Sequence, residues 1–119
     1  MNTKQKPMDQ VKKYQKIISE ALREYYHRYD NSNFPYTRQV VEDFKNNHFQ
    51  FLWVGWHERK YIFSADIHID IIDQKVWIQK DITEIGFANV LVEKGIPKSD
   101  IVLAYFPPAH RELTEFAVA

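Results

Sequence analysis

The spacing of apolar residues changes once along this chain, from a helical period to a strand period, and this change constrains the fold most. From Met8 to Tyr29, apolar side chains recur at steps of three and four residues, and most charged side chains fall off that stripe. Such a pattern is typical of one amphipathic helix of about six turns. Its predicted end is the polar segment made of Asp30, Asn31, Ser32, Asn33 and Pro35.

Beyond this segment the period approaches two, which indicates a series of strands. We expect four of them, over residues 38–44, 49–56, 61–72 and 75–80. The connections at 45–48, 57–60 and 73–74 are short and polar. Successive strands joined by short turns predict an antiparallel meander.

The last of these hairpins allows a test of register. With a two-residue turn at Asp73-Gln74, the predicted pairs are Ile71 with Val76, Ile69 with Ile78, Asp70 with Trp77, and His68 with Gln79. This register separates apolar from polar side chains, as a half-buried sheet requires. The predicted apolar face, which should pack on the first helix, carries Ile67, Ile69, Ile71, Val76 and Ile78.

A second helix and a fifth strand should follow the meander. Asp81 or Thr83 can cap a helix that runs through Phe87 to Lys94, and Gly95 suits its end. A strand is expected at 101–106, before Pro107-Pro108. In the tail at 110–119, the apolar residues suggest a docked terminus; they are Leu113, Phe116 and Val118.

The predicted fold class is therefore α+β. A long N-terminal helix packs on an antiparallel four-stranded meander, and a second helix, a fifth strand and a docked C-terminal tail follow. We expect residues 1–7 to form a flexible N-terminal tail and residues 8–119 to form a single domain.

Composition narrows the function classes. The 119 residues include 16 basic and 16 acidic side chains, so the net charge is zero, unlike that of a strongly basic nucleic-acid-binding domain. Low net repulsion is compatible with a homo-oligomer or a partner complex. The chain has no cysteine, which excludes disulfides and thiolate metal sites. No apolar run approaches the ~18 residues of a membrane span, and no signal peptide is evident, so we expect a cytoplasmic protein without membrane contact.

Catalytic motifs are absent from the sequence. The three glycines do not form a phosphate-binding loop, and no nucleophile-elbow or His-Glu-x-x-His motif occurs. A nuclease of the Asp…(Asp/Glu)-x-Lys type is rejected, because Asp70 and Lys80 are present but Ile78 stands where the second acid is needed. The sequence predicts no enzyme and no cofactor.

Three polar residues form the most suggestive cluster. Asp66, His68 and Asp70 alternate along one predicted strand, so their side chains should share one face at roughly 7 Å intervals. Carboxylates and imidazoles suit zinc, manganese or iron, and the cluster is a candidate site for a metal-dependent enzyme. The alternative interpretation, which we favour, is an ordinary solvated strand face.

Basic and aromatic residues raise the question of nucleic-acid binding. Lys12, Lys13, Lys16 and Arg23 lie on the first helix and could contact phosphates, although charged helix faces are usually only solvated. Trp53, Trp56 and Trp77 could form a platform for stacked bases, although such residues more often belong to a core or an interface. Direct DNA contact therefore stays open.

Several segments resemble the XisI family. The similarity is carried by residues 68–81, by 83–89, by 91–103, by 114–119 and by the short element at 54–56, and it extends over about residues 10–119. Three positions depart from the family pattern: Gln74 replaces a usual glycine, Ile85 a usual glutamate, and Ala104-Tyr105 a usual Gly-Phe pair. Because Gln74 suits a left-handed turn less well than glycine, a wider loop is an alternative there.

This resemblance implies a role but no catalytic residues. XisI proteins are associated with cyanobacteria, where the namesake controls excision of the fdxN element, by DNA recombination, during heterocyst differentiation. It acts with a site-specific recombinase, XisF, and a companion protein, XisH. The resemblance thus implies an accessory factor that binds an XisH-type companion, or, in a variant, an antitoxin-like neutraliser of a nuclease-like companion.

A partner surface can be predicted on the polar side of the last hairpin, where an open sheet face and the tail should meet. Trp77 is the expected anchor because tryptophan is enriched at binding hot spots. The alternative is that the second helix or the tail covers Trp77 within the same chain. The candidate surface consists of His68, Asp70, Trp77, Gln79, Asp81, Arg111 and Glu115.

Overall fold

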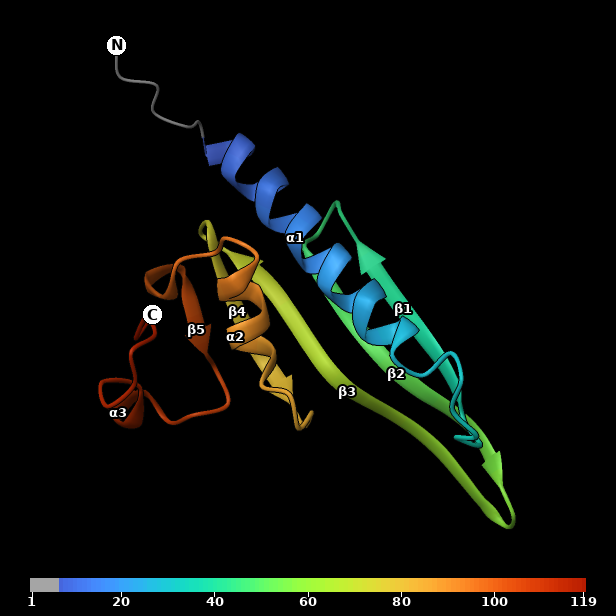
Figure 1. Cartoon of the computed structure of the whole chain (residues 1–119). Coiled ribbons are helices and arrows are strands. Elements are labelled where there is room, and N and C mark those ends of the chain that lie inside the picture. The colour runs from blue at the N-terminus through green and yellow to red at the C-terminus, as the bar shows by residue number, and fades with distance from the viewer. Residues whose placement is uncertain (1–6) are drawn as a thin grey trace.

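One five-stranded sheet, with a long helix lying along one of its faces, organises the chain (Figure 1). The computed structural model describes residues 7–119. In chain order the elements are α1 (Pro7–His27), β1 (Thr37–Asp43), β2 (His48–His57), β3 (Lys60–Ile72), β4 (Lys75–Asp81), α2 (Phe87–Glu93), the 3-10 turn η1 (Lys98–Asp100), β5 (Ile101–Leu103) and α3 (Pro108–Arg111). This is the predicted α+β fold.

Helix α1 forms where the three-and-four spacing predicts it. The described part of α1 starts at Pro7, and proline is tolerated in a first helical turn because its missing N–H would have no partner there. Pro7 therefore belongs to α1 rather than to the expected flexible tail, and the rest of that tail, residues 1–6, lies outside the described residues. The stripe that α1 buries against the sheet consists of Tyr14, Ile17, Ile18, Ala21, Leu22 and Tyr25.

The strands follow one another in space in the order β1-β2-β3-β4-β5. The first four are antiparallel, which confirms the meander. Strand β5 instead pairs parallel to β4, because the chain returns through α2 before it enters the sheet again. It spans only Ile101–Leu103, shorter than the expected 101–106, since the chain turns at once: the Phe106 N–H donates to the Leu103 carbonyl.

The hairpin between β3 and β4 has most of its predicted register. Ile71 pairs with Val76, Asp70 with Trp77, and Ile69 with Ile78. Asp73 and Gln74 both have left-handed backbone conformations, with φ of 49° and 66°, so the turn has two residues and the wider loop is wrong. One predicted pair is also wrong: a bulge beside Ile69 places His68 opposite Lys80 rather than Gln79.

The core lies between α1, α2 and one face of the sheet, here called the inner face. The five residues predicted for this face, from Ile67 to Ile78, are all buried in it. Phe49 and Phe51 add aromatic bulk from β2, and both are fully buried. Helix α2 joins the same core, and the rings of Tyr25 and Phe87 meet edge to face at 6.4 Å. Both helices therefore cover one face and leave the other without a long helix (Figure 1).

The C-terminal tail docks on the domain, but of the three apolar residues expected to anchor it only Phe116 packs against the core. Ala117 forms a parallel bridge with Val102, and Phe116 packs against the core. Leu113 is 86% exposed and Val118 is 49% exposed, so neither anchors the tail. Backbone pairing beside β5, rather than a run of apolar side chains, holds this segment.

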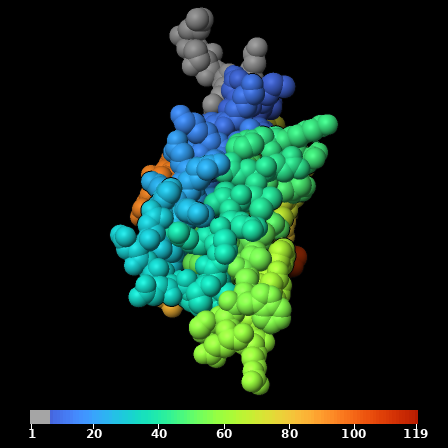
Figure 2. Space-filling view, turned by 90° about the vertical axis from the view of Figure 1, so that its right-hand side faces the viewer, coloured from blue at the N-terminus to red at the C-terminus, as the bar shows by residue number. Residues whose placement is uncertain are grey.

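The far end of the β2–β3 hairpin, residues 54–63, is called the arm. Pairing of β1 with β2 ends at Val54, whereas β2 and β3 stay paired to His57 and Lys60. The arm is therefore a two-stranded ribbon that extends past the end of α1 and projects from the molecule (Figures 1 and 2).

Candidate functional site: the outer face of the sheet

The face of the sheet opposite α1, here called the outer face, is the only broad face of the described sheet that no long helix covers (Figure 1). Since side chains alternate along a strand, the neighbours of the inner-face residues point to it. It carries, from β1 to β4, Gln39, Val41, His48, Gln50, Leu52, Val54, Trp56, Tyr61, Phe63, His68, Asp70 and Trp77.

Two histidines converge on one carboxylate oxygen of this face, at the end of β2 that lies away from the arm. His48 Nδ1 lies 2.7 Å from Asp70 Oδ1, and His68 Nε2 lies 2.8 Å from the same oxygen. Backbone pairing places them, because His48 stands directly opposite Asp70 on β2 and β3. His48, His68 and Asp70 are called the His–Asp cluster.

A glutamine completes a consistent hydrogen-bond network in this cluster. The Asp70 carboxylate can only accept, so both histidines donate to it. With its proton on Nε2, the His68 ring has Nδ1 free as an acceptor for the Gln50 amide Nε2, which lies 2.7 Å away. The network runs from Gln50 through His68 to Asp70 and on to His48. Three of its atoms, one from each cluster residue, lie within 4.8 Å of one another and could ligate a metal ion.

Beside the cluster, Trp77 is covered from the C-terminal side. The Arg111 guanidinium carbon lies 5.5 Å from the centre of the Trp77 ring. Arg111 itself is fixed, because it donates hydrogen bonds to the carbonyls of Ala104, Phe106 and Val118. Trp77 is half-buried as a result. Its environment therefore matches the alternative in which the tail covers Trp77 within the same chain, rather than a fully open face.

The arm carries the most exposed aromatic side chains of the outer face. Trp56 is 66% exposed and Phe63 is 67% exposed. Tyr61 is half exposed and stands opposite Trp56, with ring centres 5.2 Å apart. These three residues are called the arm aromatics. Trp56 was a candidate from the sequence, whereas Tyr61 and Phe63 were not, because the continuous apolar run Tyr61-Ile62-Phe63 does not mark which side chains lie on the open face.

Comparisons with known proteins agree on one family. The XisI protein family model matches residues 8–118. The chain belongs to the XisI family. Two solved structures from Anabaena variabilis are similar to it. One is a XisI-like protein with 36% identity and a TM-score of 0.84, and the match covers 92% of this chain and 99% of that one.

The second structure is the fdxN element excision controlling factor XisI. It has 28% identity and a TM-score of 0.81, and the match covers 93% of this chain and 100% of that chain. No match is found among curated proteins. Within residues 7–119, no helix has the length and apolar character needed to span a membrane.

In this XisI-family chain, Asp66 does not share a face with His68 and Asp70, so that predicted cluster is wrong. Between β2 and β3, Phe51 pairs with Ile67 and Leu52 pairs with Ala65, which leaves Asp66 as the extra residue of a bulge. The bulge turns Asp66 toward the helix side, where it lines a hollow with Tyr25 and Trp53. His48, from the neighbouring strand, takes the place expected for Asp66.

Other residues of the predicted partner surface are dispersed over the chain. Asp81 is committed to the approach to α2, where it accepts hydrogen bonds from Thr83 and from the Phe87 N–H at 2.7 Å. Gln79 is exposed at the bulge in β4. Glu115 lies on the tail, and its ion pair with Lys98 at 2.7 Å holds the pKa of its carboxyl below the usual value.

The three tryptophans do not form one platform. Trp53 is 5% exposed and packs on the inner face against Tyr29 and Phe34, with ring centres 4.8 and 4.5 Å away. Trp56 and Trp77 lie on the outer face, on different strands. The separation of three residues between Trp53 and Trp56 already placed them on opposite faces of β2.

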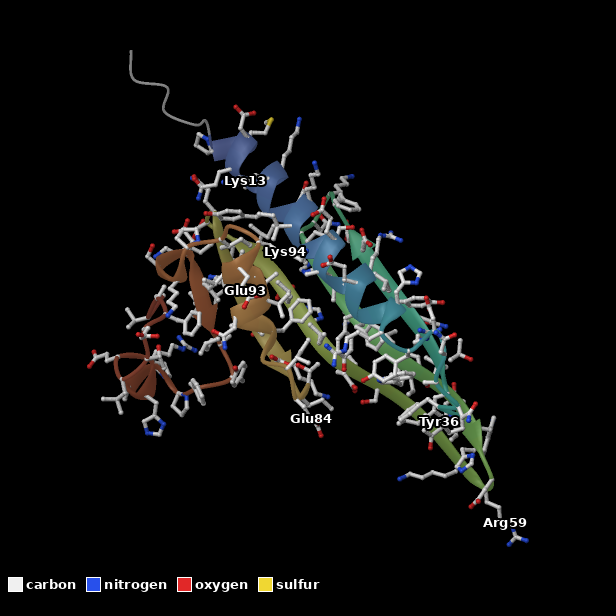
Figure 3. The ribbon with its side chains drawn as sticks, viewed as in Figure 1. Lys13, Tyr36, Arg59, Glu84, Glu93 and Lys94 are labelled. Carbon is white, nitrogen blue, oxygen red and sulfur yellow. The ribbon has the colours of Figure 1, made fainter. Side chains whose placement is uncertain are left out.

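The predicted basic face of α1 is smaller than its sequence suggests. Lys12, Lys13 and Lys16, called the α1 lysines, are exposed (Lys13 is labelled in Figure 3). Arg23 instead forms an ion pair with Glu42 at 2.8 Å, and the side chain of Glu42 is only 7% exposed. Part of the positive charge is therefore neutralised within the chain.

Proposed function

We propose that this XisI-family chain is a non-catalytic accessory factor in the control of DNA-element excision, and that it works by binding a companion protein of the XisH type. Family membership supports the first part, together with the similar structure named as an fdxN element excision controlling factor. The second part rests on the outer face of the sheet.

The arm aromatics are the observation that carries the proposal. An aromatic side chain left in water loses the gain of burial, about 25 cal/mol for each Å² of apolar surface. Trp56, Tyr61 and Phe63 nevertheless gather on one side of a projecting ribbon, at 49–67% exposure. Aromatic residues grouped in this way are typical of interface anchors.

The geometry of the arm favours docking with little loss of freedom. Backbone pairing with β3 continues to the last residues of β2, so the ribbon is already ordered. Its tip, where Arg59 lies, projects from the molecule (Figure 3). A surface that is ordered before binding loses less conformational entropy in the complex. We propose that the partner contacts the arm aromatics and the adjoining outer face toward His68, Asp70 and Trp77.

Light scattering with a purified XisH-type companion tests this proposal. We expect a stable complex at micromolar concentration with the natural chain and none with the double variant Trp56→Ser/Phe63→Ser. Leu113→Ser is the matched control, because Leu113 is also an exposed apolar residue, at 86%, but lies on the tail. Full association of the double variant would refute the arm as the docking surface.

The same complex would serve an antitoxin-like factor, and a second measurement separates the two roles. If the chain neutralises a nuclease, DNA cleavage by the companion should fall as the chain is added, in step with complex formation. Unchanged cleavage with a complex present would leave the excision-control role and exclude neutralisation.

A further inference from the structure

We infer that the His–Asp cluster binds a divalent transition-metal ion, and that zinc fits it best. This inference is independent of the proposed partner. It concerns His48, His68 and Asp70, two imidazoles and one carboxylate, which come from the neighbouring strands β2 and β3. Such a set of nitrogen and oxygen ligands is common at zinc sites.

The distances are close to those that a zinc ion would need. A tetrahedral ion bound at about 2.0–2.1 Å holds its ligand atoms roughly 3.3 Å apart. The Asp70 oxygen now lies 2.7 and 2.8 Å from the two histidine nitrogens. The two pairs that include the Asp70 oxygen must therefore open by about half an ångström, and the ligand atoms of the two histidines, which lie within 4.8 Å of each other, must come to the same separation of roughly 3.3 Å.

The ladder of backbone hydrogen bonds presents these ligands in advance. His48 and Asp70 are direct partners, and His68 stands two residues before Asp70 on the same strand. The two imidazole rings are nearly side by side, with centres 6.1 Å apart and planes inclined by 34°. Their nitrogens therefore approach the carboxylate from two directions on one side of the sheet.

Gln50 suits both the metal-free and the metal-bound states. In the network described above, His68 keeps its proton on Nε2 and Gln50 donates to Nδ1. When zinc takes Nε2, that proton moves to Nδ1, which then needs an acceptor. A half-turn of the Gln50 amide presents its oxygen for this purpose. Such hydrogen bonds orient histidine ligands at metal sites.

The arrangement leaves a coordination position on the solvent side. The side chain of His48 is 54% exposed, that of His68 is 26% exposed and that of Asp70 is 15% exposed. Zinc sites with three protein ligands keep a fourth position open in this way, whereas closed structural sites use four protein ligands. Water, or a side chain of another protein, completes the set.

Calorimetric titration of the untagged, chelator-treated protein with zinc chloride tests this inference. We expect one zinc per chain at micromolar affinity or tighter. Asp70→Asn, which keeps the shape and removes the charge, should weaken binding by at least about tenfold. The matched control is His57→Ala, because His57 is about as exposed as His48 but lies at the far end of β2.

Two results would overturn the inference. One is a zinc dissociation constant above about 0.1 mM, which corresponds to a binding free energy of only ~5 kcal/mol; the other is zinc binding by Asp70→Asn that is as tight as that of the natural chain. If a variant does not fold, imidazole NMR signals of the natural chain decide. Zinc should shift those of His48 and His68 and leave those of His27, His57 and His110 in place. Equal shifts at all five histidines would contradict the site.

Discussion

Truncation of two tryptophans on β2, three residues apart, gives opposite expected results. Trp53 is 5% exposed and has three aromatic neighbours, whereas Trp56 is 66% exposed and has one, Tyr61. Replacing a buried tryptophan by alanine costs about 3–5 kcal/mol. About a third of Trp56 is covered, so the same scale gives about 1–1.7 kcal/mol for Trp56→Ala.

Urea denaturation followed by circular dichroism measures this difference. We expect Trp53→Ala to lose about 3 kcal/mol more stability than Trp56→Ala, which corresponds to roughly 12 °C in the melting temperature. The m-values of the two variants should agree, since neither substitution changes the surface exposed on unfolding by much. Equal destabilisation would mean that Trp56 is packed in a core, and the assignment of the arm to the outer face would then be wrong.

Three further predictions concern other parts of the chain. Asp81→Ala should destabilise the protein by about 2 kcal/mol, because it removes the charged acceptor of the Phe87 N–H at the start of α2. Glu84→Ala is the control, since Glu84 is exposed, and equal unfolding curves for the two variants would contradict the role of Asp81. Replacing all three α1 lysines by glutamate should change DNA retention little in a filter-binding assay at physiological salt, since three phosphate contacts give only weak affinity. DNA binding that depends steeply on salt and is abolished by these substitutions would instead show that α1 contacts DNA. Burial raises the pKa of both Tyr14 and Tyr25 above the ordinary value of 10.0. The hydrogen bond to the Asp100 carboxylate adds to the shift at Tyr14, and the hydrogen bond with Tyr29 adds to the shift at Tyr25. The folded state therefore holds these two protons more tightly. Their contribution to stability is complete below about pH 10 and falls as the pH rises further, so the melting temperature should drop from pH 9 to pH 11, and a flat profile would argue against their burial.

The course of the chain could be predicted because each element has its own local signal. The stripe of α1, the alternation in the four strands and the short polar turns required no knowledge of distant contacts. Even the turn at Asp73-Gln74 followed from the pairing of Ile71 with Val76, since only that register separates apolar from polar side chains.

The candidate site could be predicted only in part, because bulges change which residues share a face. One extra residue at Asp66 reverses the alternation along β3, and another beside Gln79 does so along β4. Neither bulge is marked by glycine or proline. His48 could not be assigned to the cluster for a different reason: it is 20 residues from His68 in the sequence and joins it only through the pairing of β2 with β3.

Hydroxyl-radical footprinting of the chain, free and bound to an XisH-type companion, tests the proposed docking surface most directly, because it needs no substitution. The account predicts that oxidation of Trp56, Tyr61 and Phe63 falls in the complex, whereas that of Met8 and Leu113, exposed on α1 and on the tail, does not change. Unaltered oxidation of the arm aromatics, with protection of α1 or the tail instead, would contradict the claim that the arm is where this XisI-family chain binds its partner.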